Sequence, residues 1–236
     1  MGERKLNLYE IVAEAMERDI IETKTSGERM PSEQQLTEQY EVSRTVIREA
    51  LKLLSERGLI DSKVGSGAFV TKPEVQNLSD VFYRIICMYE IDWSNVYDVR
   101  CILEVAAAKK AARLVTDAEL RKMSEVLKTL KDLELPQEER NRLDFQYHRM
   151  IADASGNALL AMLIEAMRQV ITAQIELSSE SEGAILDGVQ QHGNIISALE
   201  QHDVEMAGHY MMNHITNSKK FFLMNTERKQ RISVES

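Results

Sequence analysis

The chain has 236 residues and a formal net charge of −9 at pH 7, so it is long enough for two domains that each bury a core. Its 10 glycines and 3 prolines are few for that length, which favours long helices. The two cysteines exclude a disulfide framework and a zinc knuckle, and they suggest the reducing cytoplasm. Because no signal-peptide core and no apolar run of bilayer length is evident, we expect no membrane partner.

The first 45 residues predict a helix followed by a pair of short helices. An amphipathic helix is expected over residues 6–22, and the segment 25–28 breaks it. Two further helical patterns meet at the turn 41–43. Ser32 and Ser43 are each suited to cap one of these helices, and such a pair is typical of a helix-turn-helix.

The second helix of this pair has its polar residues at its beginning. Apolar residues recur at helical spacing as far as Glu56 and predict a buried face, and Gly58 is suited to end the helix. A recognition helix contacts base edges with its N-terminal residues, and an arginine can pair with guanine or hold a phosphate. We therefore expect DNA contacts from Ser43, Arg44, Thr45 and Arg48.

A β-hairpin is expected next. The segments 59–64 and 68–70 flank Gly65, Ser66 and Gly67, and glycine permits a tight turn. A helical pair followed by a hairpin is the order of a winged helix-turn-helix, in which Lys63 and Gly65 would approach DNA from the wing. The alternative is an ordinary helical pair with a surface hairpin.

The distribution of charge favours the DNA-binding interpretation. Residues 43–72 contain six basic and three acidic side chains, a local charge of +3 within a chain of net charge −9. Positive charge is thus concentrated on the predicted reading surface, which would bind DNA locally while the acidic remainder opposes indiscriminate binding.

The rest of the chain predicts an antiparallel all-α bundle. The expected domains are a winged helix-turn-helix at 1–73, a linker at 74–78, a helical domain at 79–228 and a polar tail at 229–236. The fold class is therefore mainly α, with a small β-hairpin wing and six or seven C-terminal helices. The helices are expected over residues 79–88, 96–115, 117–133, 138–154, 158–177, 183–201 and 204–225. In the second of these, the inward residues are expected to be Val99, Ile102, Leu103, Ala106 and Ala107.

A group of potential metal ligands is spread over three of these helices. Asp144 and His148 are spaced i, i+4 and share one helix face, while His192 and His214 lie on or near the inner stripes of the last two helices. Three imidazoles and one carboxylate suit zinc first, and also manganese or nickel. The alternative is a set of hydrogen-bonded core histidines. His202 is expected at a turn, and His209 is expected on a different helix face from His214. Neither is therefore included in the predicted metal site.

Arg100 has two interpretations. It could be a surface arginine paired with Glu104 at i+4, or a cavity arginine that holds a carboxylate ligand through two hydrogen bonds. The position of Arg100 in the sequence does not distinguish between these two interpretations.

Nearly the whole chain resembles a known family. MPSEQQLTEQYEVSRTVIREALKLLSERGLI resembles the signature of GntR-type transcription regulators. The C-terminal part is similar to the helical FCD domain of the FadR subfamily, in the motifs VYDVRCILEVAAAKKAA, DFQYHRMIADASGN, QHGNIISALEQHD and MMNHI. The resemblance implies DNA contacts by Arg44, Arg48 and Gly65, and it places Arg100 near an effector cavity. It implies metal ligation by Asp144, His148, His192 and His214. Gln34 departs from the family, which often has arginine there, so the operator sequence cannot be transferred.

Together these features predict a transcription regulator. We expect a repressor that binds a pseudo-palindromic double-stranded operator as a homodimer, because one winged domain reads too few base pairs. A small organic acid bound at the metal would modulate operator binding. The alternatives are a metalloenzyme tethered to DNA and a regulator with a purely structural metal. No H-E-x-x-H glutamate is present, so we do not expect an enzyme.

Overall fold

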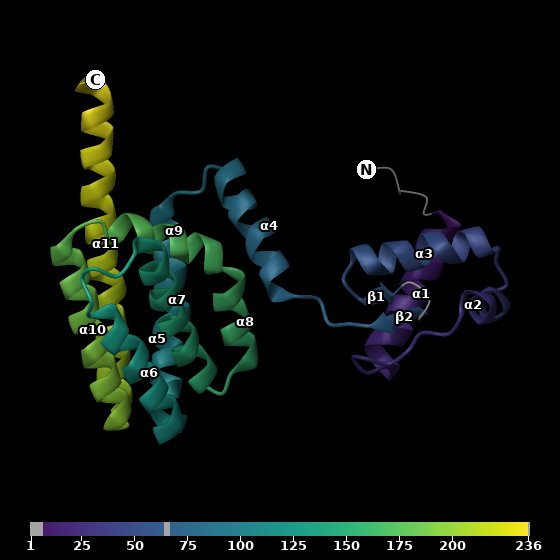
Figure 1. Ribbon diagram of the computed structural model, residues 1–236, viewed down its shortest axis with the longest axis horizontal. Coiled ribbons are helices and arrows are strands. Elements are labelled where there is room, and N and C mark those ends of the chain that lie inside the picture. Colours follow the sequence, from purple (N-terminus) through teal and green to yellow (C-terminus); the bar gives the residue numbers. More distant parts are fainter. Residues whose placement is uncertain (1–6, 64–66, 236) are drawn as a thin grey trace. The chain divides into compact units, whose positions relative to one another are not determined.

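The computed structural model describes residues 7–63 and 67–235 (Figure 1). It separates into two compact units, Met1–Glu74 and Val75–Ser236, which we call unit 1 and unit 2. Each unit has its own apolar core.

Unit 1 has the helix-turn-helix and hairpin that the sequence predicts. Its elements are α1 (Leu8–Thr23), α2 (Glu33–Tyr40), α3 (Arg44–Glu56), β1 (Ile60–Lys63) and β2 (Gly67–Val70). Ser32 caps α2 through a hydrogen bond from the Gln35 backbone N–H, and the Gln35 side chain accepts one from the Ser32 backbone N–H. β1 and β2 pair antiparallel, with Ile60 opposite Val70. These caps and this register bring α3 and the wing together around one core.

The core of unit 1 uses the apolar positions expected for α3. Ile47, Ala50 and Leu54 are fully buried, beside Leu36 of α2. Gly58 follows the end of α3 with φ at +70°, a left-handed conformation that glycine adopts without steric cost. The chain can therefore turn directly from the recognition helix into β1.

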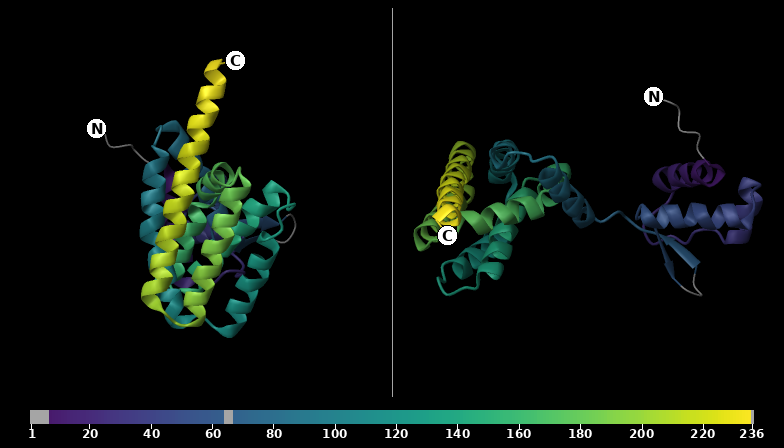
Figure 2. Two further views of the ribbon diagram at one scale, coloured as in Figure 1. Left: turned by 90° about the vertical axis from the view of Figure 1, so that its left-hand side faces the viewer. Right: turned by 90° about the horizontal axis from the view of Figure 1, so that it is seen from above.

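In the described part of unit 2, all regular structure is helical (Figure 2). The helices are α4 (Val75–Met88), α5 (Trp93–Leu114), α6 (Asp117–Leu130), α7 (Gln137–Ala154), α8 (Ala158–Ala166), α9 (Arg168–Ser178), α10 (Glu182–Glu200) and α11 (Val204–Glu235). α11 packs along both α5 and α10, and α7 lies against α5, α6 and α9. This arrangement surrounds a polar centre with helices that are distant in sequence.

Several helix boundaries differ from the sequence prediction, and the described part of unit 2 has eight helices rather than six or seven. α5 begins at Trp93 rather than at residue 96, and α6 ends at Leu130 rather than at 133. α4 begins at Val75 rather than at residue 79, and α11 continues to Glu235 rather than ending at 225. The single helix expected over residues 158–177 is two helices that meet at a 61° bend. At the bend, the Met167 backbone N–H bonds to the carbonyls of Leu163 and Ile164, which closes α8. In the described residues, no single helix is long and apolar enough to cross a membrane.

Candidate metal centre and DNA-reading surface

The polar residues predicted to contact DNA lie at the start of α3. Ser43 caps the helix by accepting a hydrogen bond of 3.4 Å from the Val46 backbone N–H. Arg44, Thr45 and Arg48 are exposed beyond this cap. Arg48 donates to Glu33 of α2 at 2.9 Å, but both side chains are exposed, at 69% and 42%. Such an exposed ion pair contributes little free energy to stability.

The wing has a neighbour that the sequence did not predict. Lys63 ends β1 opposite Gly67, while Gly65 lies outside the described residues. Gly67 has φ at +94°, and a Cβ there would lie only 3.3 Å from Arg29 Nε. The exposed guanidinium of Arg29 therefore lies against the base of the wing. Its position in a loop before α2 gave no signal in the sequence.

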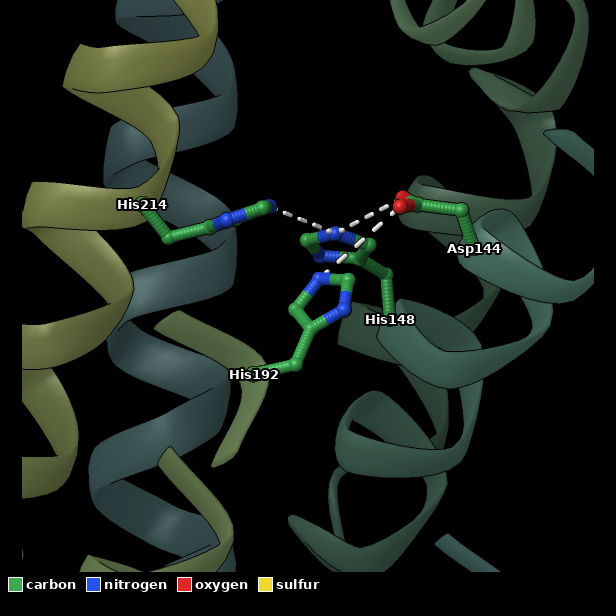
Figure 3. A group of neighbouring side chains, drawn as sticks. All are labelled: Asp144, His148, His192 and His214. Atoms are coloured by element: carbon green, nitrogen blue, oxygen red, sulfur yellow. Dashed lines mark hydrogen bonds and ion pairs between the residues drawn. The ribbon is translucent and has the colours of Figure 1, made fainter. Parts of the chain in front are cut away.

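The four side chains predicted to bind a metal converge in unit 2 (Figure 3). Asp144 and His148 come from α7, His192 from α10 and His214 from α11. One potential ligand atom of each lies within 4.8 Å of the others. His148 Nε2 is 3.4 Å from Asp144 Oδ1 and 3.1 Å from His214 Nε2, and His192 Nε2 is 4.0 Å from Asp144 Oδ2.

These residues have the chemistry of a metal site. All three imidazoles are at most 6% exposed. Among the described residues, His192 has no hydrogen-bond partner on either ring nitrogen, and His214 has none on Nδ1. Buried polar atoms without partners are costly, and three nitrogens with one carboxylate oxygen form a donor set that suits a divalent transition metal. The residues therefore fit a bound ion better than they fit an ordinary core.

Burial affects the three imidazoles unequally. Desolvation lowers the pKa of His192 to about 4 and that of His214 well below its usual value. Both rings are thus neutral at pH 7, which is the form that binds metal. For His148, desolvation is outweighed by Glu104 and Asp144, which raise its pKa to about 9. The Asp144 carboxylate would accept a hydrogen bond from a protonated His148 Nε2. It would equally bind a divalent cation that took the place of that proton.

Glu104 of α5 is a site residue that sequence reasoning did not identify as one. Its carboxylate forms an ion pair with His148 Nδ1 and accepts a 2.7 Å hydrogen bond from Arg100 Nε. Burial opposes its charge, but Arg100 and His148 together lower the pKa of the carboxyl. A carboxylate on the far nitrogen of a ligating histidine fixes the ring and its tautomer. Glu104 therefore directs His148 Nε2 toward the other three side chains.

The predicted inward face of α5 was wrong in part. Val99 and Ile102 are 42% and 70% exposed and Ala106 is exposed as well, whereas Arg100 and Glu104 are each 1% exposed. The sequence left two interpretations of Arg100 open, an ion pair with Glu104 and an arginine inside a cavity. The structure has both features. Arg100 does pair with Glu104, and it does so inside the bundle.

A cavity adjoins the cluster. About 40 Å³ is open to the centres of water molecules, and the walls include Arg100, Arg140, Asp144, His192 and His214. Arg100 Nη1 donates to Gln174 Oε1 at 3.4 Å, but its buried Nη2 has no hydrogen-bond partner in the described chain. A planar guanidinium with a free donor can bind an anion at this point.

Two histidines predicted to lie outside the site do so. His202 is at the turn between α10 and α11, where its Nδ1 lies 2.8 Å from the Ala112 carbonyl oxygen. His209 is exposed on α11 and contacts Asn213. Neither belongs to the four-residue cluster.

A winged helix-turn-helix followed by a helical unit with a buried polar cavity is an architecture typical of DNA-binding transcription regulators. The model for the FCD domain matches residues 95–217, and the one for bacterial regulatory proteins of the gntR family matches residues 8–70. The chain belongs to the GntR family, and its pair of domains fits the FadR-like subfamily. Regulators of this family bind operator DNA, and FCD domains bind small-molecule effectors.

Individual relatives agree with this assignment. The chain is 31% identical over 199 residues to the HTH-type transcriptional regulator LutR of Bacillus subtilis, covering 81% of this chain and 90% of that protein. It is 30% identical over 220 residues to the Uxu operon transcriptional regulator of Escherichia coli, covering 89% and 84%. These relatives are transcription regulators, not enzymes.

A solved structure supports the fold. The Streptococcus agalactiae GntR structure aligns with a TM-score of 0.71 at 24% identity, covering 90% of this chain and 99% of that chain.

Proposed function

We propose that this regulator senses a small carboxylic acid at a metal ion held by Asp144, His148, His192 and His214. Zinc is the first choice, because it favours nitrogen ligands with an open position for a further ligand, and manganese and nickel accept the same donors. When bound, the ion supplies a positive centre that anchors an anion. The residues around it hold the ion in place and orient the anion.

The unpartnered Nη2 of Arg100 carries this proposal. It belongs to a buried guanidinium that lines the same cavity as Asp144, His192 and His214. A carboxylate that bridges the ion and Arg100 would satisfy both at once.

In unit 1, the proposed DNA contacts are made by Ser43, Arg44, Thr45, Arg48, Lys63 and Gly65. We propose that the chain binds a pseudo-palindromic operator as a homodimer and acts as a repressor in the cytoplasm. Two reading heads double the number of base pairs that are recognised. The acid alters operator binding only if it binds one arrangement of the helices better than another. Deletion of the gene should raise transcription from the operator in a reporter strain, whereas a fall would identify an activator.

The test combines metal content with acid-dependent operator affinity. His214→Ala should lose metal and the response to the acid, yet it should still bind the operator. The matched control is His209→Ala, which removes an exposed histidine from the same helix. Retention of full metal content and a full response by His214→Ala would refute the proposed sensor site.

Arg100 requires a conservative variant. Its guanidinium also bonds to Glu104, so truncation to alanine would disturb His148 as well as the cavity. Arg100→Lys keeps a positive charge beside Glu104 but removes the planar fork. It should retain the metal and bind the acid more weakly. Unchanged acid affinity would argue against the carboxylate clamp, whatever the metal does.

A further inference from the structure

Arg140 is a second buried arginine in the wall of the cavity beside the proposed metal site. It lies near the beginning of α7, four residues before Asp144, and it is only 3% exposed. Four residues advance a helix by about 6 Å and keep nearly the same face, so Arg140 lies one turn from the proposed ligand Asp144. The cavity therefore has guanidinium groups at two points, Arg100 on α5 and Arg140 on α7.

The guanidinium of Arg140 has hydrogen-bond partners but no counter-ion. Its Nη1 donates to the carbonyl oxygen of Leu130 at 2.8 Å, and its Nη2 donates to the carbonyl oxygen of Asp132 at 2.6 Å. Both acceptors are neutral backbone groups, and no ion pair involves Arg140 in the part of the chain that the structure describes. A buried charge without a partner of opposite charge is costly, so this position favours an anion.

Arg100 differs from Arg140 in this respect. Burial opposes the charge of Arg100, but the carboxylate of Glu104 outweighs that effect and raises the pKa of the guanidinium. For Arg140, burial has the larger effect and lowers the pKa, although Asp132 and Asp144 oppose it. Arginine stays protonated in both surroundings. Arg140 therefore brings a positive charge to the cavity that the surrounding side chains do not neutralise.

We infer that the effector is a short dicarboxylic acid, with one carboxylate at the metal ion and Arg100 and the second carboxylate at Arg140. This inference rests on the proposed function, which requires only the first of these carboxylates. A guanidinium has five N–H donors, so the two bonds to backbone carbonyls leave others for a ligand. A carboxylate bound there would supply the missing counter-ion through charge-assisted hydrogen bonds.

Asp187 would favour a different ligand. It lies on α10 in the same cavity wall, and both of its carboxylate oxygens accept hydrogen bonds of 3.2 Å from Asn217 Nδ2. A carboxylate can accept a hydrogen bond from a hydroxyl group, and it repels a second anion. Asp187 would thus suit a hydroxylated monocarboxylic acid. However, Asn217 already satisfies Asp187, whereas nothing neutralises Arg140, so the second carboxylate has the stronger support.

Calorimetric titration of the zinc-loaded, full-length chain tests the inference. The probes are succinate, glutarate and adipate, each paired with the monocarboxylate of equal chain length, namely butyrate, pentanoate and hexanoate. Gluconate represents the hydroxylated monocarboxylic acids. The best dicarboxylate should bind about 30-fold or more tightly than its monocarboxylate partner, because only the dicarboxylate gains a buried ion pair with Arg140.

Three variants show whether Arg140 causes that difference. Arg140→Gln should weaken the best dicarboxylate by about 30-fold or more and its monocarboxylate partner by less than about 3-fold. Arg140→Lys keeps the positive charge and should retain much of the preference. The matched control is Arg142→Gln on the same helix, where the side chain is 59% exposed and binding should not change. Metal content and circular dichroism confirm that each variant keeps its site and its fold, and Arg140→Lys serves if Arg140→Gln does not fold.

The outcomes separate this inference from the proposed function. Equal affinities for the dicarboxylate and its monocarboxylate partner, or tighter binding of gluconate, would overturn the inference and leave the sensor of carboxylic acids intact. An equal loss of both acids in Arg140→Gln would also overturn it, because Arg140 would then only support the fold. If the zinc-loaded wild type binds none of these acids, the inference and the proposed function both fail.

Discussion

Glu104 connects two residues that serve different purposes, since it orients His148 and holds Arg100 beside the cavity. We expect Glu104→Gln to weaken metal binding by about 10–100-fold, because the amide keeps the shape but not the charge that supports the ligating ring. Metal titration calorimetry checks this. Glu125→Gln, at an exposed position of α6, is the control. Wild-type affinity in Glu104→Gln would show that His148 needs no such partner.

Arg44 and Arg48 differ in their surroundings although both are exposed on α3. Arg48 already pairs with Glu33. If Arg44 reads a base, Arg44→Ala should cost about 1–3 kcal/mol on the operator and less on random DNA. Fluorescence anisotropy on the two DNAs provides the comparison. Equal losses on both DNAs would mean that Arg44 contacts only phosphate.

The sequence predicted the four-residue cluster but not its support, and the reason is local. Asp144 and His148 are i, i+4 on one helix, so their proximity follows from helix geometry. Glu104 and His148 are brought together only by the packing of α5 on α7, which leaves no trace in sequence spacing. The inward face of α5 was misjudged for the same reason. In an amphipathic sequence pattern, Arg100 and Glu104 at i, i+4 are typical of an exposed ion pair. The neighbouring Val99 and Ile102 were therefore expected to face inward.

At the scale of elements, the helix beginnings that a serine caps were predicted better than the helix breaks. Ser32 and Ser43 each cap a helix by accepting a hydrogen bond from a nearby backbone N–H, a local interaction that residue type reveals. The bend between α8 and α9 has no glycine or proline to signal it. Arg149 and Arg168 both pair with Glu165 there, so tertiary ion pairs accompany a break in an otherwise continuous apolar pattern.

This bend can be tested through Glu165, which is 4% exposed between its two arginines. Glu165→Ala should lower the free energy of unfolding by about 1.5–3 kcal/mol, the range for hydrogen bonds to charged groups. Asp153→Asn is the matched control, because Asp153 pairs with the same Arg149 but is 54% exposed on its side chain. It should cost less than about 1 kcal/mol. Urea unfolding measures both variants, and equal losses would mean that Glu165 gains nothing from burial.

At the scale of the whole molecule, the two separate cores allow metal binding to stabilise one unit without the other. The proposed ligands come from α7, α10 and α11, all in unit 2. An ion that binds only the folded state adds to the stability of the unit that holds it. Unit 1 contains none of these ligands, and it has its own apolar core.

Trp93 makes this separation measurable. It is the one tryptophan in the chain, and its ring lies 6.0 Å from that of Phe222 in unit 2. Tryptophan fluorescence therefore reports on unit 2 alone. Metal at about 100 times its Kd should stabilise unit 2 by about 2.7 kcal/mol, and a chelator should remove that gain.

The expected result is a Trp93 unfolding transition that moves to lower temperature on chelation. Circular dichroism should retain a second component, from unit 1, that does not move. His214→Ala should show the lower Trp93 transition with or without the chelator. If chelation shifts both components together, the units unfold as one and the metal's effect is not confined to the helical sensor. If chelation shifts neither transition, the cluster binds no metal that contributes to stability. The effector site must then be sought without a metal ion.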